Sequence, residues 1–296
     1  DWAEAEAPPG TIFALDARTG VLRWTFDSIP KEIAAQTGTA NVWASMSVDA
    51  ERNLLYIPVS SPSPNFFGGN RLKPIPLETS VTALDIATGK VVWSRQLVQH
   101  DLWDYDTNSA PTLIDITRDG KTIPALVQTS KQGFLYVLDR TNGEPIYPIE
   151  ERPVPQSTVP GERSSTTQPF VALPRATVDP EWPGIFKLAD IVSFGYCSRK
   201  LKELVYQGRF TPPSLQGSLT YPATIGGVEW GGGAVDPDKQ IFVVNNTSAV
   251  QIYQLLAEGN SNKEVAARLG VSLHTVETHR TRIMDKLDVH NAAELV

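Results

Sequence analysis

An eleven-residue motif occurs three times in the first half of the chain and constrains the fold more than any other feature. The copies occupy residues 14–24, 83–93 and 137–147 and align without gaps. All share Leu-Asp at the second and third positions, Gly at the seventh and an aromatic residue at the last. The Asp can hydrogen-bond turn backbone, and Gly permits a positive φ. Each copy therefore predicts a strand, a turn and a second strand.

The spacing of the copies predicts a repeat architecture. The motif aspartates, Asp16, Asp85 and Asp139, lie 69 and 54 residues apart. Such spacings suit four-stranded antiparallel blades with insertions, arranged radially as in a β-propeller. We expect a mainly β fold, an open arc of about four blades. The motif's last residues, Trp24, Trp93 and Tyr147, should be buried between sheets. Three unrelated hairpins with Asx turns are the alternative, which the repetition of every motif position disfavours.

Composition limits what each part of the chain can do. Residues 251–296 hold five Lys/Arg and six Asp/Glu, so the totals of 26 and 33 leave 21 and 27 for residues 1–250. An acidic first part is not a nucleic-acid binder by bulk electrostatics. No apolar run approaches the roughly 20 residues that span a bilayer. The single cysteine, Cys197, excludes an intrachain disulfide. The first residue is Asp1, so we expect a mature product or a fragment, with localisation unknown.

The pattern changes near residue 250. Helical periodicity is found over 251–258, which Gly259 closes, and over 262–269, which Gly270 closes. Ser272 is a typical N-cap for a third helix that runs to about residue 287. Two helices joined by a short turn predict a helix-turn-helix. We therefore divide the chain into a β domain, 1–250, and a small all-α module, 251–296. A solubilising helical hairpin is the alternative for the module.

Several motifs of the first part resemble those of one enzyme family. They are His-Asp-Leu-Trp-Asp-Tyr-Asp at 100–106, Lys-Gln-Gly-Phe-Leu-Tyr-Val-Leu-Asp-Arg at 131–140, Phe-Thr-Pro-Pro-Ser at 210–214 and Glu-Trp-Gly-Gly-Gly at 229–233. With them, residues 8–250 resemble the glucose dehydrogenase-like branch of the pyrroloquinoline quinone (PQQ) dehydrogenases, which are eight-bladed quinoprotein propellers. The resemblance covers only about half of such a propeller. It implies a periplasmic oxidoreductase that passes hydride from a sugar or alcohol to PQQ, with a quinone as electron acceptor.

The resemblance also implies roles for individual residues. Asp104 corresponds to the general base, and Lys131 to the cation that hydrogen-bonds the quinone oxygens. Trp43 is similar to the indole that stacks on the cofactor. Trp230 and Asn245 correspond to later-blade residues that approach it. Without the resemblance, the aspartates of 101–106 would be a turn cluster and Lys131 a solvated turn residue.

The family's metal site is only partly present. The resemblance implies Ca²⁺, or another divalent or lanthanide ion, bound by Asp104, Asp106 and Asn65. In methanol-oxidising relatives an Asn ligand occurs at the position of Ser61, and a Glu comes from an earlier blade that this chain lacks. A hard cation requires several oxygen ligands. In the family PQQ sits on the propeller axis, so half a ring supplies only half of the cofactor pocket. We therefore expect little or no turnover.

Residues 251–296 resemble the LuxR-type DNA-binding domain of transcriptional regulators. The similarity rests on residues 256–266 and on Thr-Val-Glu-Thr-His at 275–279. It implies duplex DNA as partner and a cytoplasmic site of action, with the helix from Ser272 in the major groove. The implied contacts with bases and phosphates are Lys263, Thr275, Glu277, Thr278, Arg280, Thr281, Arg282 and Lys286. The chain is thus interpreted as a chimera of two fragments; a protein with neither activity is the third hypothesis.

Overall fold

The computed structural model describes residues 10–34, 37–173, 191, 194–253, 255, 272, 274 and 275. The chain separates into two compact units, Asp1–Tyr253 and Gln254–Val296. The described residues of the first unit form seven open sheets and one α-helix, α2 (Tyr196–Lys202). The expectation of a mainly β fold with open sheets is thereby confirmed.

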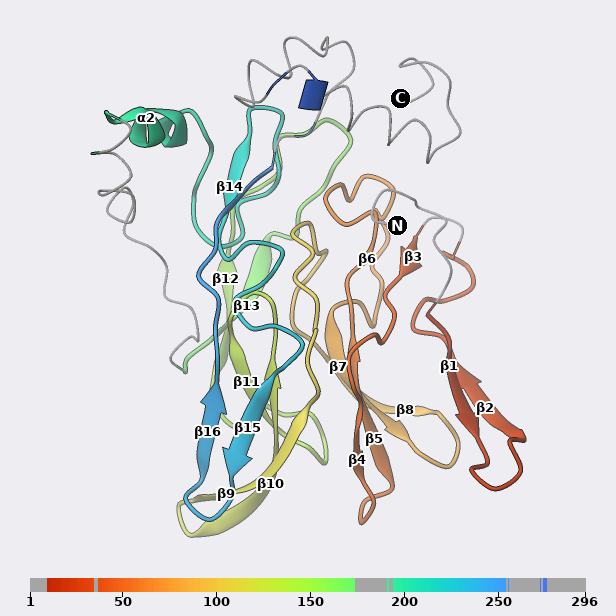
Figure 1. Cartoon of the computed structure of the whole chain (residues 1–296). Coiled ribbons are helices and arrows are strands. Elements are labelled where there is room, and N and C mark those ends of the chain that lie inside the picture. Colours follow the sequence, from red (N-terminus) through yellow and green to blue (C-terminus); the bar gives the residue numbers. More distant parts are fainter. Residues whose placement is uncertain are drawn as a thin grey trace. The chain divides into compact units, whose positions relative to one another are not determined.

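One sheet has the four antiparallel strands expected of a blade. Its order is β4 (Ser47–Asp49), β5 (Leu54–Val59), β7 (Ser80–Asp85) and β8 (Val91–Gln96), and Figure 1 shows these strands side by side. A second sheet has three strands in the order β11 (Leu135–Asp139), β10 (Lys121–Thr129) and β9 (Thr112–Arg118).

The other described strands form antiparallel pairs. These pairs are β1 (Ile12–Leu15) with β2 (Leu22–Phe26), β3 (Gly38–Thr39) with β6 (Pro62–Ser63), β12 (Ile149–Pro153) with β13 (Thr167–Val171), β14 (Ser218–Thr220) with β17 (Gln251–Tyr253), and β15 (Gly233–Asp236) with β16 (Ile241–Val244). Only one described sheet therefore has the full four strands that the repeat predicts for each blade.

The three motif turns are built as their residues require. In each turn the amide of the motif glycine donates to the carbonyl oxygen of the motif aspartate, at a distance of 2.8 Å. The pairs are Gly20 with Asp16, Gly89 with Asp85, and Gly143 with Asp139. The three glycines have φ of 71°, 70° and 75°, in the left-handed region that favours glycine. Local chemistry alone therefore explains the identical turns.

The aromatic end of each of the first two copies contacts the turn of the next copy. The Trp24 indole donates to the Ile86 carbonyl oxygen (3.0 Å), and the Trp93 indole donates to that of Arg140 (3.1 Å). A Cβ on Gly89 would lie 2.6 Å from the Trp24 ring, and one on Gly143 would lie 2.5 Å from the Trp93 ring. Glycine thus serves both the turn and the ring that packs on it.

Burial of the three aromatic residues differs from the expectation. Trp93 is buried, but Trp24 and Tyr147 are only partly buried. Trp24 lies on β2, whose described sheet has two strands, so fewer neighbours cover its ring. The Tyr147 ring is covered by the Arg118 guanidinium, 5.0 Å from its centroid, in place of a following turn glycine.

A second repeated hairpin was not recognised in the sequence. The β4–β5 turn and the β15–β16 turn begin at Asp49 and Asp236, whose carboxylates accept the amides of Arg52 (3.2 Å) and Lys239 (3.1 Å). Asn53 and Gln240, the residues before β5 and β16, have φ of 57° and 54°. Because neither residue is glycine, the signal is weaker than that of the eleven-residue motif.

An aromatic cluster forms the core beneath the loops that carry the candidate site. Trp103, Tyr105, Phe134, Tyr136 and Phe210 are each at most 1% exposed. The Trp103 indole donates to the Thr211 carbonyl oxygen (2.7 Å), which anchors the 100–106 segment to a loop more than a hundred residues later. The flanking motifs at 100–106, 131–140 and 210–214 therefore converge through packing.

The expected first helix of the tail is wrong at its start. Residues Gln251–Tyr253 form β17, because their backbone pairs with β14 in the first unit. Ser272 behaves as the predicted N-cap: its hydroxyl accepts the Thr275 amide at 3.0 Å. The rest of the expected helix-turn-helix, including Lys263, lies outside the described residues, as do Glu277, Thr278, Arg280, Thr281, Arg282 and Lys286. No helix among the described residues is long and apolar enough to cross a membrane.

Replacing Gly143 by Ala tests the contact between repeats. The substitution places a Cβ in the Trp93 ring and also strains a backbone with φ of 75°. Gly120→Ala is the matched control, since Gly120 has φ of 72° with open space around it. We expect Gly120→Ala to lower the free energy of unfolding by about 1 kcal/mol, and Gly143→Ala by about 1–3 kcal/mol more. Urea denaturation measures both; equal losses would contradict the docking of Trp93 on the turn.

Candidate active site

A buried lysine stands between two aspartates. Lys131, from the turn that joins β10 and β11, places Nζ 2.8 Å from Asp104 Oδ2 and 2.7 Å from Asp106 Oδ2. Lys131 is 7% exposed. Burial lowers the pKa of its amine, but the charges of Asp106 and Asp104 outweigh burial and hold that pKa above its usual range. Lys131 therefore carries a permanent charge here.

Backbone contacts from distant segments fix the cluster. The Ser61 amide donates to Asp106 Oδ1 at 2.7 Å, and the Lys131 amide donates to the Asp106 carbonyl oxygen at 3.2 Å. The Gly227 amide donates to the Lys131 carbonyl oxygen at 2.7 Å. Three segments far apart in sequence thus hold the ion pairs in one geometry.

The pKa of the Asp104 carboxyl is raised toward neutrality. Burial, and then the charge of Asp106, raises the pKa of Asp104 to about 7, although Lys131 acts in the opposite direction. Its φ is +58°, which is the left-handed region. Asn65 Nδ2 donates to Asp104 Oδ1. Both oxygens of the Asp104 carboxylate therefore accept a hydrogen bond, one from Asn65 and one from Lys131.

Trp43 offers a flat, accessible ring next to this cluster. Its ring centroid lies 6.0 Å from Lys131 Nζ, and the residue is 47% exposed. Five residues that the sequence singles out, Trp43, Asn65, Asp104, Asp106 and Lys131, are thus brought together. Trp230 is 74% exposed and Asn245 is also exposed, so both side chains lie outside the buried cluster.

Glu229 and Asn108 belong to the surroundings of Lys131, and sequence reasoning gave them no role. Asn108 Nδ2 donates to the Val228 carbonyl oxygen (2.9 Å) and contacts Glu229 Oε2 (3.4 Å). Burial raises the pKa of Glu229, and the charge of Lys131 partly opposes this rise. Among the described residues, Glu229 Oε1 and Asn108 Oδ1 are buried acceptors without a hydrogen-bond partner. The Glu-Trp-Gly-Gly-Gly motif was the available signal.

Comparison with known proteins identifies the family. A family model described as "PQQ: Glucose/ethanol/alcohol dehydrogenase, beta-propeller domain" matches residues 1–290. The chain belongs to this family. The match extends beyond residue 250 and includes most of the segment with the LuxR-like motif. PQQ and a divalent or lanthanide ion are the cofactors of the family's quinoprotein dehydrogenases.

Two curated relatives and two solved structures show the extent of the similarity. Quinoprotein glucose dehydrogenases of Escherichia coli (strain K12) and Gluconobacter oxydans (strain 621H) are 37% and 38% identical, over 86% of this chain and 33% of each relative. A quinohemoprotein alcohol dehydrogenase, ADHIIG, from Pseudomonas putida HK5 has a TM-score of 0.57 at 24% identity, covering 87% of this chain and 36% of that one. A europium-containing methanol dehydrogenase has a TM-score of 0.52 at 20% identity, covering 81% and 40%.

The similar structures share the fold of the described β unit. The chain spans about a third of the length of the curated relatives it matches. Their complete enzymes thus contain residues that have no counterpart here.

Replacing Lys131 by Met tests the charge balance of the cluster. Two buried carboxylates then lose their cation, which typically costs about 3–5 kcal/mol at a pH where both are ionised. Because a raised Asp pKa means that the folded state holds its proton longer than the unfolded state, stability falls as pH rises from about 4 to 7. We expect the variant to lose more stability at pH 8 than at pH 5.

Urea denaturation at both pH values measures this difference, and Lys121→Met, an exposed lysine of β10, is the control. A Lys131→Met loss that is small, or equal at the two pH values, would show that the cation does not balance buried charge.

Proposed function

We propose that this chain carries part of the active site of a PQQ-dependent dehydrogenase that oxidises a sugar or an alcohol. The observation that supports it most is the proximity of Asp104, Lys131 and the exposed Trp43 ring. A base with a pKa near neutrality, a fixed cation and a flat apolar surface are what proton removal next to a bound quinone requires.

The residues present fit PQQ. A planar aromatic group can stack on the accessible face of Trp43 while its oxygens approach Lys131. An ammonium group has three N–H donors. Two of those of Lys131 are donated to Asp104 and Asp106, so the third is left for an oxygen of the cofactor. When bound, PQQ supplies the electrophilic carbonyl that accepts hydride.

The protein residues manage the proton and the charge. Ionised Asp104 accepts the proton of the substrate hydroxyl through the oxygen that Asn65 otherwise occupies. Lys131 stabilises negative charge that develops on a neighbouring oxygen. Asp106 stays bound to Lys131 and to the Ser61 amide, and so keeps the cation in place when Asp104 is protonated.

The residues present do not fit a resident metal ion equally well. Asn65, Asp104 and Asp106 supply oxygens, but Asn65 and Lys131 occupy both oxygens of Asp104. Among the described residues, no three His, Cys, Asp or Glu side chains form a metal-binding group. A divalent ion at these oxygens would have to displace the Lys131 ammonium, so no step is assigned to a metal.

PQQ binding tests the proposal without requiring turnover, which we expect to be slight because the chain matches only a third of its relatives' length. Added PQQ should quench tryptophan fluorescence. Trp43→Leu should weaken the affinity by about fivefold or more, since a base–indole type of stacking contact is worth about 1–3 kcal/mol. Trp230→Leu tests the expected approach of Trp230 and should have the smaller effect, because this side chain is 74% exposed. Absence of PQQ binding by the parent chain would refute the proposed function.

We further propose that residues 251–296 bind duplex DNA, as the LuxR-like motif implies. The Ser272 cap on the amide of Thr275 supports a helix that starts where the motif requires it. In fluorescence anisotropy titrations of the full chain, Arg282→Ala and Lys286→Ala should each weaken binding to all duplexes and flatten its salt dependence. Thr278→Ala should change sequence preference, and Lys239→Ala on the β unit is the control. No binding at low salt would exclude this role.

A further inference from the structure

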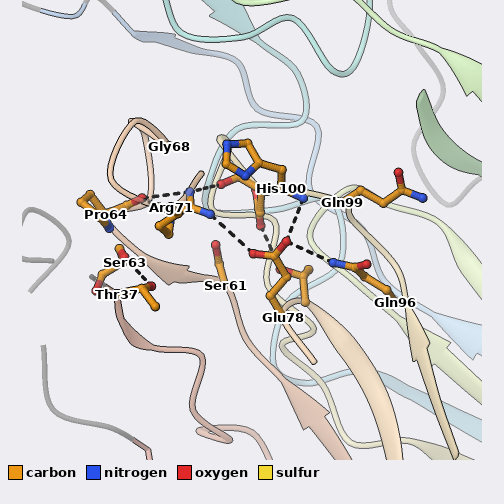
Figure 2. A network of polar contacts seen from close by, with 12 residues as sticks. Thr37, Ser61, Ser63, Pro64, Gly68, Arg71, Glu78, Gln96, Gln99 and His100 are labelled. Carbon is orange, nitrogen blue, oxygen red and sulfur yellow. Dashed lines mark hydrogen bonds and ion pairs between the residues drawn. The ribbon is translucent and has the colours of Figure 1, made fainter. Parts of the chain in front are cut away.

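A fully buried arginine joins the two loops that carry Asn65 and Asp104. Arg71 is 2% exposed. Its Nη2 donates to the Pro64 carbonyl oxygen (3.0 Å) and to the Asp101 carbonyl oxygen (2.6 Å), and its Nε donates to the former at 3.2 Å. Figure 2 shows Arg71 among these groups, with Pro64 on one side and His100 on the other. One guanidinium therefore fixes the residue before Asn65 and the residue three before Asp104.

Asp101 continues this link to the backbone around Asp104. Its Oδ1 accepts the Trp103 amide and its Oδ2 accepts the Tyr105 amide, each at 2.8 Å. These two residues flank Asp104, whose φ of +58° is a conformation that costs a non-glycine residue about 1–2 kcal/mol. Such a conformation persists only where the surroundings fix it. The Asp101 carboxylate supplies that constraint.

Glu78 closes the network at the start of the same loop. Its Oε2 lies 3.5 Å from Arg71 Nη1, while its Oε1 accepts the His100 amide (2.9 Å) and Gln96 Nε2 (3.1 Å). His100 also has a positive φ, of 48°. Figure 2 shows the Glu78 carboxylate between Arg71, Gln96 and the His100 backbone. The loop is thus fixed at its first residues as well as around Asp104.

The energetics argue against a purely structural role. Burying a guanidinium with a single 3.5 Å ion pair is costly, and replacing both members of a buried ion pair by apolar side chains of similar volume often costs no stability. What an apolar residue cannot do is donate to two carbonyl oxygens on different loops, for which the planar fork of arginine is suited. The distinguishing contribution of Arg71 is therefore the relative placement of the two loops.

We propose that Arg71 is a positioning residue that sets the contact between Asn65 and Asp104, and thereby the orientation of Asp104 toward Lys131. The catalytic meaning of this inference rests on the proposed function, because that proposal makes Asp104 the proton acceptor. The geometric claim concerns the protein alone and is tested without PQQ.

The test follows the Asn65 side-chain amide by NMR in the full chain, with asparagine labelled by ¹⁵N. Its signal is assigned by its loss in Asn65→Ala. At one fixed pH, its protons should exchange slowly with water in the parent, because Asn65 Nδ2 donates to Asp104. Arg71→Met should release the two loops and speed this exchange by about tenfold or more, since the contact is then formed only part of the time.

Two further variants separate positioning from stability and from charge. Arg140→Met removes another buried arginine, which pairs with Asp49 and Asp115, and it should lower stability but leave the Asn65 amide exchange rate at a fixed pH unchanged. Arg71→Lys keeps the charge beside Glu78 without the planar fork, so its Asn65 amide should also exchange faster than in the parent. It carries the test alone if Arg71→Met does not fold.

The outcomes are decisive in both directions. A folded Arg71→Met chain with the parental Asn65 amide exchange rate would overturn the proposal. So would complete restoration by Arg71→Lys, which would show that only charge balance is needed. If the parent does not bind PQQ, the proposed function fails, while the Asn65 amide exchange still decides whether Arg71 positions Asp104.

Discussion

The candidate site depends on one cation that two carboxylates share away from water. Lys131 lies within 2.8 Å of both Asp104 and Asp106, and this unequal charge count leaves one negative charge in excess. Because burial disfavours that excess charge, the pKa of Asp104 rises to about 7. Lys131 therefore anchors both carboxylates, while burial and the charge of Asp106 raise the pKa of Asp104 against the effect of that cation.

Local chemistry made much of the fold predictable, and burial of charge made the rest unpredictable. The Asp and Gly of the repeated motif specify their turns within five residues, so the strands around Asp85 and Asp139 could be expected from the sequence. The roles of Trp43, Asp104 and Lys131 could be predicted because these residues lie in segments that resemble those of a known family. Arg71 gave no such signal, since its partners at Pro64 and Asp101 are carbonyl groups that every residue has.

Pairing between distant segments explains the errors near the end of the β unit. Residues 251–258 have a helical apolar pattern, yet β14 supplies Gln251–Tyr253 with backbone partners and these three residues form a strand. Glu229 was overlooked for a related reason, because its relation to Lys131 depends on how the 226–229 loop folds back. The pairing of β14 with β17 has no local signature, and the Glu-Trp-Gly-Gly-Gly motif does not by itself place Glu229 near Lys131.

The tryptophan contacts between repeats have a direction. Trp24 donates to the residue after Asp85, and Trp93 donates to the residue after Asp139, so each repeat is latched onto its successor. A row of units coupled in this way resembles a one-dimensional chain of nearest-neighbour interactions. Its two ends are not equivalent: losing a unit at the downstream end leaves an indole without its dock, whereas losing one at the upstream end leaves only an unoccupied turn. The N-to-C direction of the chain therefore decides which end of the row of repeats loses a packing contact when a repeat is removed.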